Sequence, residues 1–139
     1  TNCSNNYGPR QHKEKLIPKT ISNILQNKSI PVYGKGENIR DWIYVKDHCR
    51  AILDLWYAGG EGQKYNIGGE CEVKNIDLVK MIIKIMGASE DLIQYVDDRP
   101  GHDLRYAIDN AKIKNTVAFK PEYSLMDGLT KTIEWYENT

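Results

Sequence analysis

Hydrophobic side chains recur along this chain at spacings that predict amphipathic helices. After Leu16, apolar positions follow at offsets of one, four, five, eight and nine residues, so residues 15–28 are predicted to form a helix. The same periodicity predicts helices over residues 45–58 and 75–86. The helix at 45–58 is expected to bury Ala51, Ile52, Leu55 and Trp56, with Cys49 beside them.

Two further helical segments are predicted near the carboxyl end. Residues 111–115 are expected to form a helical turn. Ser124 followed by Asp127 resembles a capping box, which favours the start of a helix there. This last helix is expected to bury one face, made of Leu125, Leu129, Ile133 and Tyr136.

Short runs rich in β-branched and aromatic residues predict strands between these helices. Residues 30–33 and 39–45 flank a turn with Gly34 and Gly36, and this arrangement predicts a hairpin. Three further short strands are expected at 65–67, 93–96 and 105–109. The pattern predicts a small α/β domain with short strands and about four helices.

Composition limits the kind of partner this domain can have. The 139 residues suggest one domain, and 19 basic residues balance 19 acidic ones, so bulk charge does not favour a nucleic acid or a membrane surface. No apolar run approaches the ~20 residues that span a bilayer, and no signal-peptide pattern opens the chain. The three cysteines, Cys3, Cys49 and Cys71, lack metal-ligand spacing, so we expect buried or idle thiols and no metal.

The polar opening of the chain provides the first candidate contacts. Residues 1–9 are rich in amides and hydroxyls and are expected to form a loop in which Asn5 and Asn6 either bind a ligand or close an Asx-turn. Pro18 is tolerated only in a first helical turn, which places Lys15 at the amino end of the first helix. Anions are favoured there, although Lys15 could also be a solvated cation.

Two arginines are candidate phosphate ligands. Arg40 lies where a strand begins, and a guanidinium fixed there can bind a phosphate with two parallel hydrogen bonds; the alternative is a surface pair with Asp41. Arg99 and His102 flank a Pro-Gly turn and could bind the same kind of anion. The alternative there is an exposed turn in which neighbouring carboxylates neutralise Arg99.

Asn75 and His48 each have a structural and a functional interpretation. Asn75 suits the N-cap of the helix at 75–86, but its amide could also reach a ligand. His48 is expected to be a core histidine with one satisfied nitrogen rather than a catalyst.

Several catalytic motifs are absent from the sequence. It contains no Gly-x-Gly-x-x-Gly turn for a dinucleotide, no Gly-x-x-x-x-Gly-Lys phosphate loop and no His-Glu-x-x-His. None of the nine tyrosines has a lysine four residues later. The residues alone therefore predict a domain with a phosphate-binding pocket and no self-contained catalytic apparatus.

Six motifs occur in order along the chain: Ser-Asn-Asn-Tyr-Gly-Pro at 4–9, Glu-Lys-Leu-Ile-Pro at 14–18, Pro-Val-Tyr-Gly at 31–34, Ile-Arg-Asp-Trp-Ile-Tyr-Val at 39–45, Tyr-Asn-Ile-Gly-Gly at 65–69 and Asp-Arg-Pro-Gly-His-Asp at 98–103. Together they resemble the carboxy-terminal part of the dTDP-glucose 4,6-dehydratase family, within the extended short-chain dehydrogenases/reductases. Many nucleotide-sugar epimerases and dehydratases share the Asn-x-Tyr-Gly-Pro and Arg-Asp-x-x-Tyr-Val motifs. The pairing of Glu-Lys-Leu-Ile-Pro with Asp-Arg-Pro-Gly-His-Asp occurs in far fewer proteins and points to the dTDP-glucose enzymes. The resemblance implies that residues 1–139 form a nucleotide-sugar-binding domain, and that residues 1–9 are the tail of a missing dinucleotide-binding domain.

The resemblance also implies a role for each matching residue. Substrate-binding residues would be Asn5 at the sugar or diphosphate, Lys15 and Leu16 at the nucleotide, Pro31 and Tyr33 beside the thymine, Arg40 and Arg99 at the diphosphate, and Asn75 and His102 in the nucleotide pocket. Asn6 would reach toward NAD.

The family reaction implied by the resemblance is an internal redox cycle on dTDP-glucose. NAD oxidises the sugar at C4, water leaves across C5–C6, and the hydride returns to C6, giving the dTDP-4-keto-6-deoxyglucose used in dTDP-rhamnose synthesis. The acid/base groups belong to the missing domain, so no catalytic residue is expected in this chain, and the piece alone is expected to be inactive. A cytoplasmic homodimer is implied for the complete enzyme. The alternatives are a UDP-sugar epimerase or decarboxylase of the same superfamily, or a non-catalytic nucleotide-sugar-binding module.

Overall fold

The computed structural model describes residues 1–139 as five α-helices, eight short strands and one 3₁₀-helix, Glu90–Leu92. The helices are α1 Leu16–Leu25, α2 Val45–Ala58, α3 Asn75–Ile85, α4 Ala111–Val117 and α5 Leu125–Glu137. The strands are β1 Asn2–Cys3, β2 Asn5–Tyr7, β3 Ile30–Tyr33, β4 Ile39–Tyr44, β5 Asn66–Ile67, β6 Glu72–Lys74, β7 Ile93–Val96 and β8 Arg105–Tyr106. The expected α/β class is confirmed, with α4 a seven-residue helix rather than a single turn.

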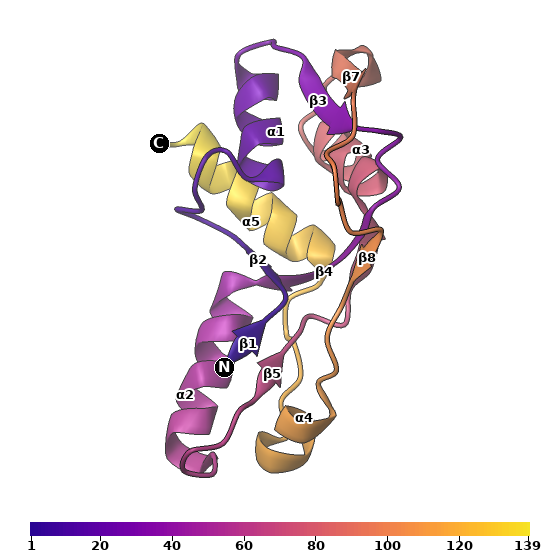
Figure 1. The fold of residues 1–139 in the computed structure, drawn as a ribbon. Coiled ribbons are helices and arrows are strands. Elements are labelled where there is room, and N and C mark those ends of the chain that lie inside the picture. The colour runs from indigo at the N-terminus through magenta and orange to yellow at the C-terminus, as the bar shows by residue number, and fades with distance from the viewer.

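Strand β4 is the centre of the molecule. It pairs in parallel with β2 and β8 and antiparallel with β6. Two separate parallel pairs, β1–β5 and β3–β7, complete the strand pairing. Helices α1, α3 and α5 lie at one end of the molecule with β3 and β7, and α2 and α4 lie at the other end with β1 and β5 (Figure 1).

The predicted hairpin between residues 30–33 and 39–45 is wrong. Strand β3 pairs with β7, with Ile30 opposite Ile93, and β4 pairs elsewhere. Gly34 and Gly36 do adopt positive φ, at 55° and 71°, but the turn redirects the chain between two sheets instead of reversing it. Burial explains the outcome, because Ile30 and Val32 pack with Val79 and Ile83 of α3.

The predicted polar loop at residues 1–9 is also wrong in part, because it contains β1 and β2. Asn5, Asn6 and Tyr7 pair in register with Trp42, Ile43 and Tyr44. Tyr7 is 2% exposed and packs with both Trp42 and Tyr44. Tertiary contacts therefore override the local preference of an amide-rich segment for a loop.

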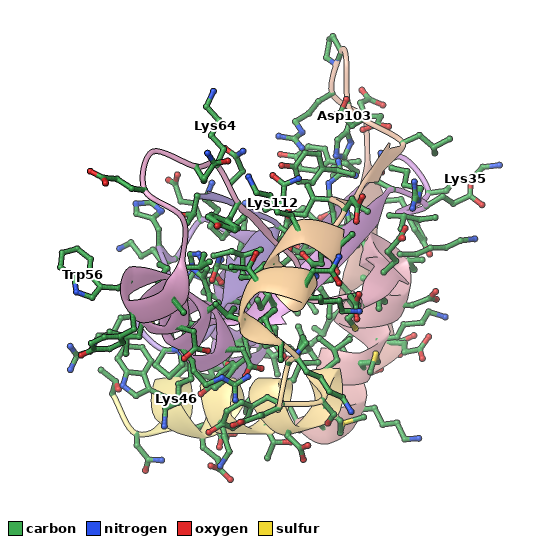
Figure 2. The ribbon with its side chains drawn as sticks, turned by 90° about the horizontal axis from the view of Figure 1, so that it is seen from below. Lys35, Lys46, Trp56, Lys64, Asp103 and Lys112 are labelled. Atoms are coloured by element: carbon green, nitrogen blue, oxygen red, sulfur yellow. The ribbon has the colours of Figure 1, made fainter.

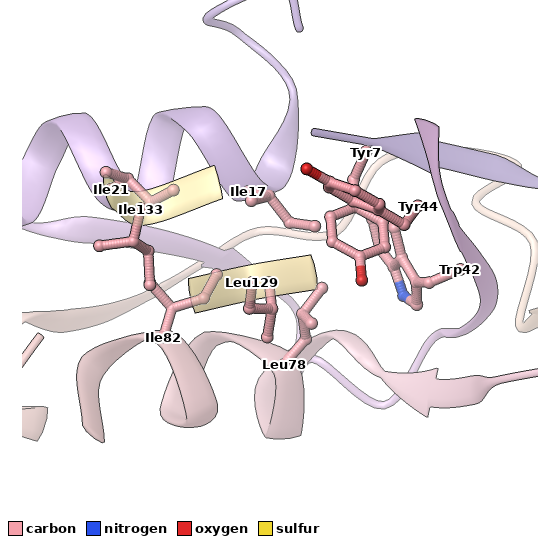
Figure 3. Close-up of a cluster of buried hydrophobic side chains, with 9 residues drawn as sticks. All are labelled: Tyr7, Ile17, Ile21, Trp42, Tyr44, Leu78, Ile82, Leu129 and Ile133. Atoms are coloured by element: carbon pink, nitrogen blue, oxygen red, sulfur yellow. The ribbon is translucent and has the colours of Figure 1, made fainter. Parts of the chain in front are cut away.

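A cluster of nine buried side chains joins α1, α3 and α5 to β2 and β4 (Figure 3). Ile17 and Ile21 of α1 lie in it with Leu129 and Ile133 of α5, as the helical periodicity predicts. Ser124 accepts a hydrogen bond from the Asp127 amide, so the predicted cap of α5 is confirmed. The cluster fixes the start of α1 and α3 against β4.

Helix α2 buries a narrower face than its sequence predicts. Ala51 is fully buried and Leu55 is half-buried, but Ile52 is 40% exposed and Trp56 is 83% exposed. Trp56 projects outward from the helix (Figure 2). The neighbours of Ala51 form only a small buried cluster, so Ile52 and Trp56 remain exposed to solvent.

Three smaller predictions have mixed outcomes. Cys3 and Cys49 are exposed and Cys71 is half-buried, all as free thiols, so the buried alternative fails for the first two. His48 is half-buried rather than a core residue, and its buried Nε2 has no hydrogen-bond partner, so the predicted core histidine with a satisfied nitrogen is not what the chain forms. None of the helices is both long and apolar enough to span a bilayer.

Candidate functional site

One cavity of about 800 Å³ lies where β2, β3, β4, α1 and α3 converge. Its volume falls within the range of small-ligand sites, roughly 300–1,000 Å³. All ten residues selected from the sequence line it: Asn5, Asn6, Lys15, Leu16, Pro31, Tyr33, Arg40, Asn75, Arg99 and His102. The remaining lining residues are Gln11, His12, Glu14, Lys19, Val32 and Trp42.

Secondary structure positions each group of lining residues. Strand β2 brings Asn5 and Asn6 beside β4, which carries Arg40. Lys15 is the N-cap residue of α1, as its distance from Pro18 predicts. Asn75 is the first residue of α3 and not its N-cap, which is Lys74, so the predicted capping role is wrong.

The cavity carries an excess of positive charge. Lys15, Lys19, Arg40 and Arg99 line it, and Glu14 is the one carboxylate among the lining residues. A concave surface lined by one sign of charge concentrates the opposite ion. The cavity therefore suits an anionic ligand, although the chain as a whole has a formal net charge of zero.

Arg40 is fixed by backbone carbonyls. Its guanidinium donates to Ile39 O at 2.7 Å and to Asp103 O at 2.9 Å, and it forms no ion pair with Asp41. Asp41 is buried and accepts hydrogen bonds from the amides of Gly69 and Cys71. The alternative of an Arg40–Asp41 surface pair is therefore wrong, and no carboxylate compensates the charge of Arg40.

The loop after β7 places Arg99 and His102 around Tyr33. The Arg99 guanidinium lies 5.0 Å from the centre of the Tyr33 ring, and the His102 ring meets Tyr33 edge-on. The carboxylate of Asp98 lies 2.6 Å from His102 Nδ1 and accepts a hydrogen bond from the Arg99 amide. His102, the Arg99 amide and nearby positive charge hold the pKa of Asp98 below its usual value.

Arg99 itself forms no ion pair with a carboxylate. The carboxylate of the preceding residue, Asp98, is paired with His102. The alternative in which acidic neighbours neutralise the Arg99 guanidinium is therefore not what the structure shows.

Unpaired polar atoms concentrate at this cavity. Six buried side-chain nitrogen or oxygen atoms have no hydrogen-bond partner, and four of them belong to lining residues: Asn6 Oδ1, Gln11 Oε1, Trp42 Nε1 and Asn75 Oδ1. Buried polar groups are nearly always paired in folded proteins, so a group of exceptions requires an explanation. A bound ligand or ordered water would supply the partners.

Two lining residues that the sequence analysis missed carried a detectable signal. Lys19 lies in the first turn of α1, four residues after the N-cap residue Lys15, so the helical period places it on the side of α1 from which Lys15 leads in. Trp42 follows Arg40 by two residues in β4, and strand alternation puts both side chains on one face. Gln11 and His12 belong to an irregular loop, where no periodicity could have selected them.

Comparison with known protein families shows to which family the chain belongs. Residues 1–132 match the family described as GDP-mannose 4,6 dehydratase. The chain belongs to this family. A dTDP-glucose 4,6-dehydratase from Escherichia coli is 52% identical over 149 residues, covering 99% of the chain and 41% of that protein. One from Streptomyces niveus is 46% identical over 138 residues with the same coverage.

Solved structures of similar proteins share the fold. The dTDP-glucose 4,6-dehydratase of Bacillus anthracis, in complex with NAD, superposes with a TM-score of 0.93 at 47% identity, covering 99% of this chain and 43% of that one. A UDP-glucose 4-epimerase from Thermotoga maritima superposes with a TM-score of 0.92 at 28% identity, covering 98% and 44%. The resemblance to the dTDP-glucose dehydratases is thus confirmed, and the chain spans about two fifths of the length of these relatives.

Proposed function

We propose that this chain is the substrate-binding part of a dTDP-glucose 4,6-dehydratase, a hydro-lyase. The observation that carries the proposal is the convergence of all ten expected ligand residues on one cationic cavity. The 52% identity to a dTDP-glucose 4,6-dehydratase supports the choice of sugar nucleotide. On this proposal residues 1–139 are one nucleotide-sugar-binding domain, and residues 1–9 continue from the dinucleotide-binding domain.

The proposed binding roles follow from the chemistry of the lining residues. Arg40 and Arg99 neutralise the diphosphate, because neither guanidinium is paired with a carboxylate. Tyr33 offers a flat ring beside which a thymine can stack, with Pro31 next to it on β3. The other proposed substrate ligands are Asn5, Lys15, Leu16, Asn75 and His102.

NAD is the proposed cofactor, and it would accept and return the hydride. Relatives of this chain have been solved with NAD bound. Asn6 fits a minor part of that site, because its Oδ1 is buried and unpaired while its Nδ2 donates to Ser4 O. Most NAD contacts, and the acid/base groups, are assigned to the part of the enzyme outside this chain. Within the chain, the side chains bind and orient the sugar nucleotide.

The wider setting is part of the same proposal. The complete enzyme works in the cytoplasm as a homodimer, binds no nucleic acid, and makes the dTDP-4-keto-6-deoxyglucose that dTDP-rhamnose synthesis consumes. The even balance of basic and acidic residues supports the absence of a nucleic-acid partner.

Nucleotide selectivity tests the proposal. Isothermal titration of the complete enzyme with dTDP and with UDP is expected to show tighter binding of dTDP. Tighter binding of UDP would instead favour an epimerase or decarboxylase, the alternative supported by the 28% identity to the UDP-glucose 4-epimerase.

A turnover assay separates the enzyme from a non-catalytic module. The matching 43% of the Bacillus anthracis enzyme can be exchanged for this chain, and the hybrid supplied with dTDP-glucose. Formation of the 4-keto-6-deoxy sugar is expected. A folded hybrid that binds dTDP-glucose without turnover would leave the binding module as the better account.

Replacing Tyr136 by phenylalanine is expected to weaken dTDP binding by a small factor. The Tyr136 hydroxyl of α5 donates to Gln11 O at 2.7 Å, and Gln11 Nε2 donates to Asn6 O at 2.7 Å. The Tyr136 hydrogen bond orders the Gln11 edge of the cavity. Its loss, at about 1 kcal/mol, corresponds to roughly a fivefold loss in affinity. Tyr123→Phe is the matched control, because that hydroxyl makes no hydrogen bond within the chain. Equal dTDP affinities for Tyr136→Phe and Tyr123→Phe would show that the Tyr136 hydroxyl does not order the cavity.

A further inference from the structure

We propose that Trp42 is an additional ligand-binding residue, whose indole N–H donates a hydrogen bond to a phosphate oxygen of the bound nucleotide. This inference rests on the proposed function, because it adds a contact to the same site. Trp42 lies within the family motif that contains Arg40, but the resemblance gave it no role at the ligand. Its ring packs edge-on to Tyr7, with the ring centres 6.2 Å apart, within the cluster of nine buried side chains. This packing accounts for the aromatic ring but not for the indole N–H.

The first argument is the unpaired donor. Trp42 is 5% exposed and lines the cavity, and its buried Nε1 has no hydrogen-bond partner. An indole nitrogen can only donate, so its partner must be an acceptor. A buried donor without a partner is destabilising, and such groups are rare in native proteins. The missing acceptor is expected to arrive with the ligand.

The second argument is the position of Trp42 between two candidate ligands of the phosphate. It lies two residues after Arg40 on the same face of β4, and it is the register partner of Asn5 on β2. The main chain of Trp42 is already anchored, because its amide donates to Cys71 O at 3.0 Å. The indole is therefore held on the strand face that carries Arg40.

The third argument is the chemistry of the cavity. Lysines and arginines outnumber carboxylates among its lining residues by four to one. The ligand group that such a surface attracts is an anion, and phosphate oxygens accept hydrogen bonds. A donor placed beside Arg40 is therefore matched to a phosphate oxygen rather than to the base.

The test compares dTDP with thymidine, which has the same base and no phosphate. Trp42→Phe keeps an aromatic ring and removes the N–H. In the complete enzyme this variant is expected to bind dTDP roughly tenfold more weakly and thymidine with unchanged affinity. Trp135→Phe, a half-buried tryptophan of α5 outside the cavity lining, is the matched control and is expected to change neither.

Each other result has a defined meaning. Unchanged dTDP affinity in Trp42→Phe would overturn the inference and leave the proposed function standing. An equal loss for dTDP and thymidine would also overturn it, since ring packing would then be responsible. Failure of the unaltered enzyme to bind dTDP would contradict the proposed function itself.

A spectroscopic measurement on the unaltered enzyme covers the case in which Trp42→Phe does not fold. Isotope labelling restricted to residues 1–139 of the complete enzyme leaves the three tryptophans of this chain visible, and Trp56→Phe and Trp135→Phe assign two of their indole N–H signals, leaving the third to Trp42. Addition of dTDP is expected to shift the Trp42 N–H signal and to slow the exchange of this proton with solvent. Addition of thymidine is expected to have neither effect. An unresponsive Trp42 signal at saturating dTDP would overturn the inference.

Discussion

Replacing Arg99 by alanine is expected to weaken dTDP binding roughly ten- to a hundredfold. Hydrogen bonds to charged groups contribute about 1.5–3 kcal/mol, and each 1.4 kcal/mol is about a tenfold change in affinity. The Arg99 guanidinium stacks over Tyr33 at 5.0 Å and pairs with no carboxylate, so its charge is free for the ligand. Titration of the complete enzyme with dTDP measures the change.

A matched arginine separates this local effect from a loss of net charge. Arg105 is exposed, lies outside the cavity lining and already binds both carboxylate oxygens of Glu72 at 2.6 Å. Arg105→Ala removes the same charge and is expected to leave dTDP affinity within about twofold of the unaltered protein, because surface charges are screened by salt. Equal losses for the two variants would show that Arg99 acts only through the overall field.

Replacing Asp47 by alanine is expected to lower the free energy of unfolding by about 3 kcal/mol, or roughly 10 °C in melting temperature. Asp47 is 1% exposed and accepts hydrogen bonds from the amides of Glu122 and Tyr123, at 3.0 and 3.1 Å. It also pairs with Arg50 at 3.2 Å. Alanine would leave two amides without acceptors and release the segment that leads into α5. Thermal and urea unfolding measure the loss.

Asp77 is the control for the effect of a carboxylate in a first helical turn. It occupies the first turn of α3 as Asp47 does that of α2, but it is exposed. Asp77→Ala is expected to cost less than about 1 kcal/mol, the scale of a helix-dipole interaction. If Asp47→Ala cost no more than Asp77→Ala, the two amide contacts would contribute nothing beyond the dipole.

Local patterns predicted the helices well because helix formation depends on neighbours in sequence. The apolar positions of α1 and α5 recur at the helical period and are those that the core buries, such as Ile17, Ile21, Leu129 and Ile133. The cap at Ser124 is equally local. Arg40 and Arg99 could be selected as phosphate candidates from residue type and turn position alone.

The partner of each strand could not be read from the sequence. Residues 30–33 and 39–45 have the local signature of a hairpin, yet β3 pairs with β7 and β4 with β2. Likewise, Trp56 has the right spacing for a buried stripe on α2, but no element of the chain covers it. Both outcomes depend on which other elements pack against the segment in the folded chain. The spacing of apolar residues within one segment does not contain that information.

By itself, the sequence determined the α/β class, the apolar faces of α1 and α5 and the family motifs, and the resemblance carried by those motifs named the ten residues expected at a ligand site. The tertiary structure decided that these residues, spread from Asn5 to His102, line one cavity. It also decided that Arg40 is bound by backbone carbonyls rather than by Asp41, and that Trp42 Nε1 is left unpaired. The physical reason is that residue type and spacing fix what a side chain can do, whereas strand register and packing fix which groups it meets.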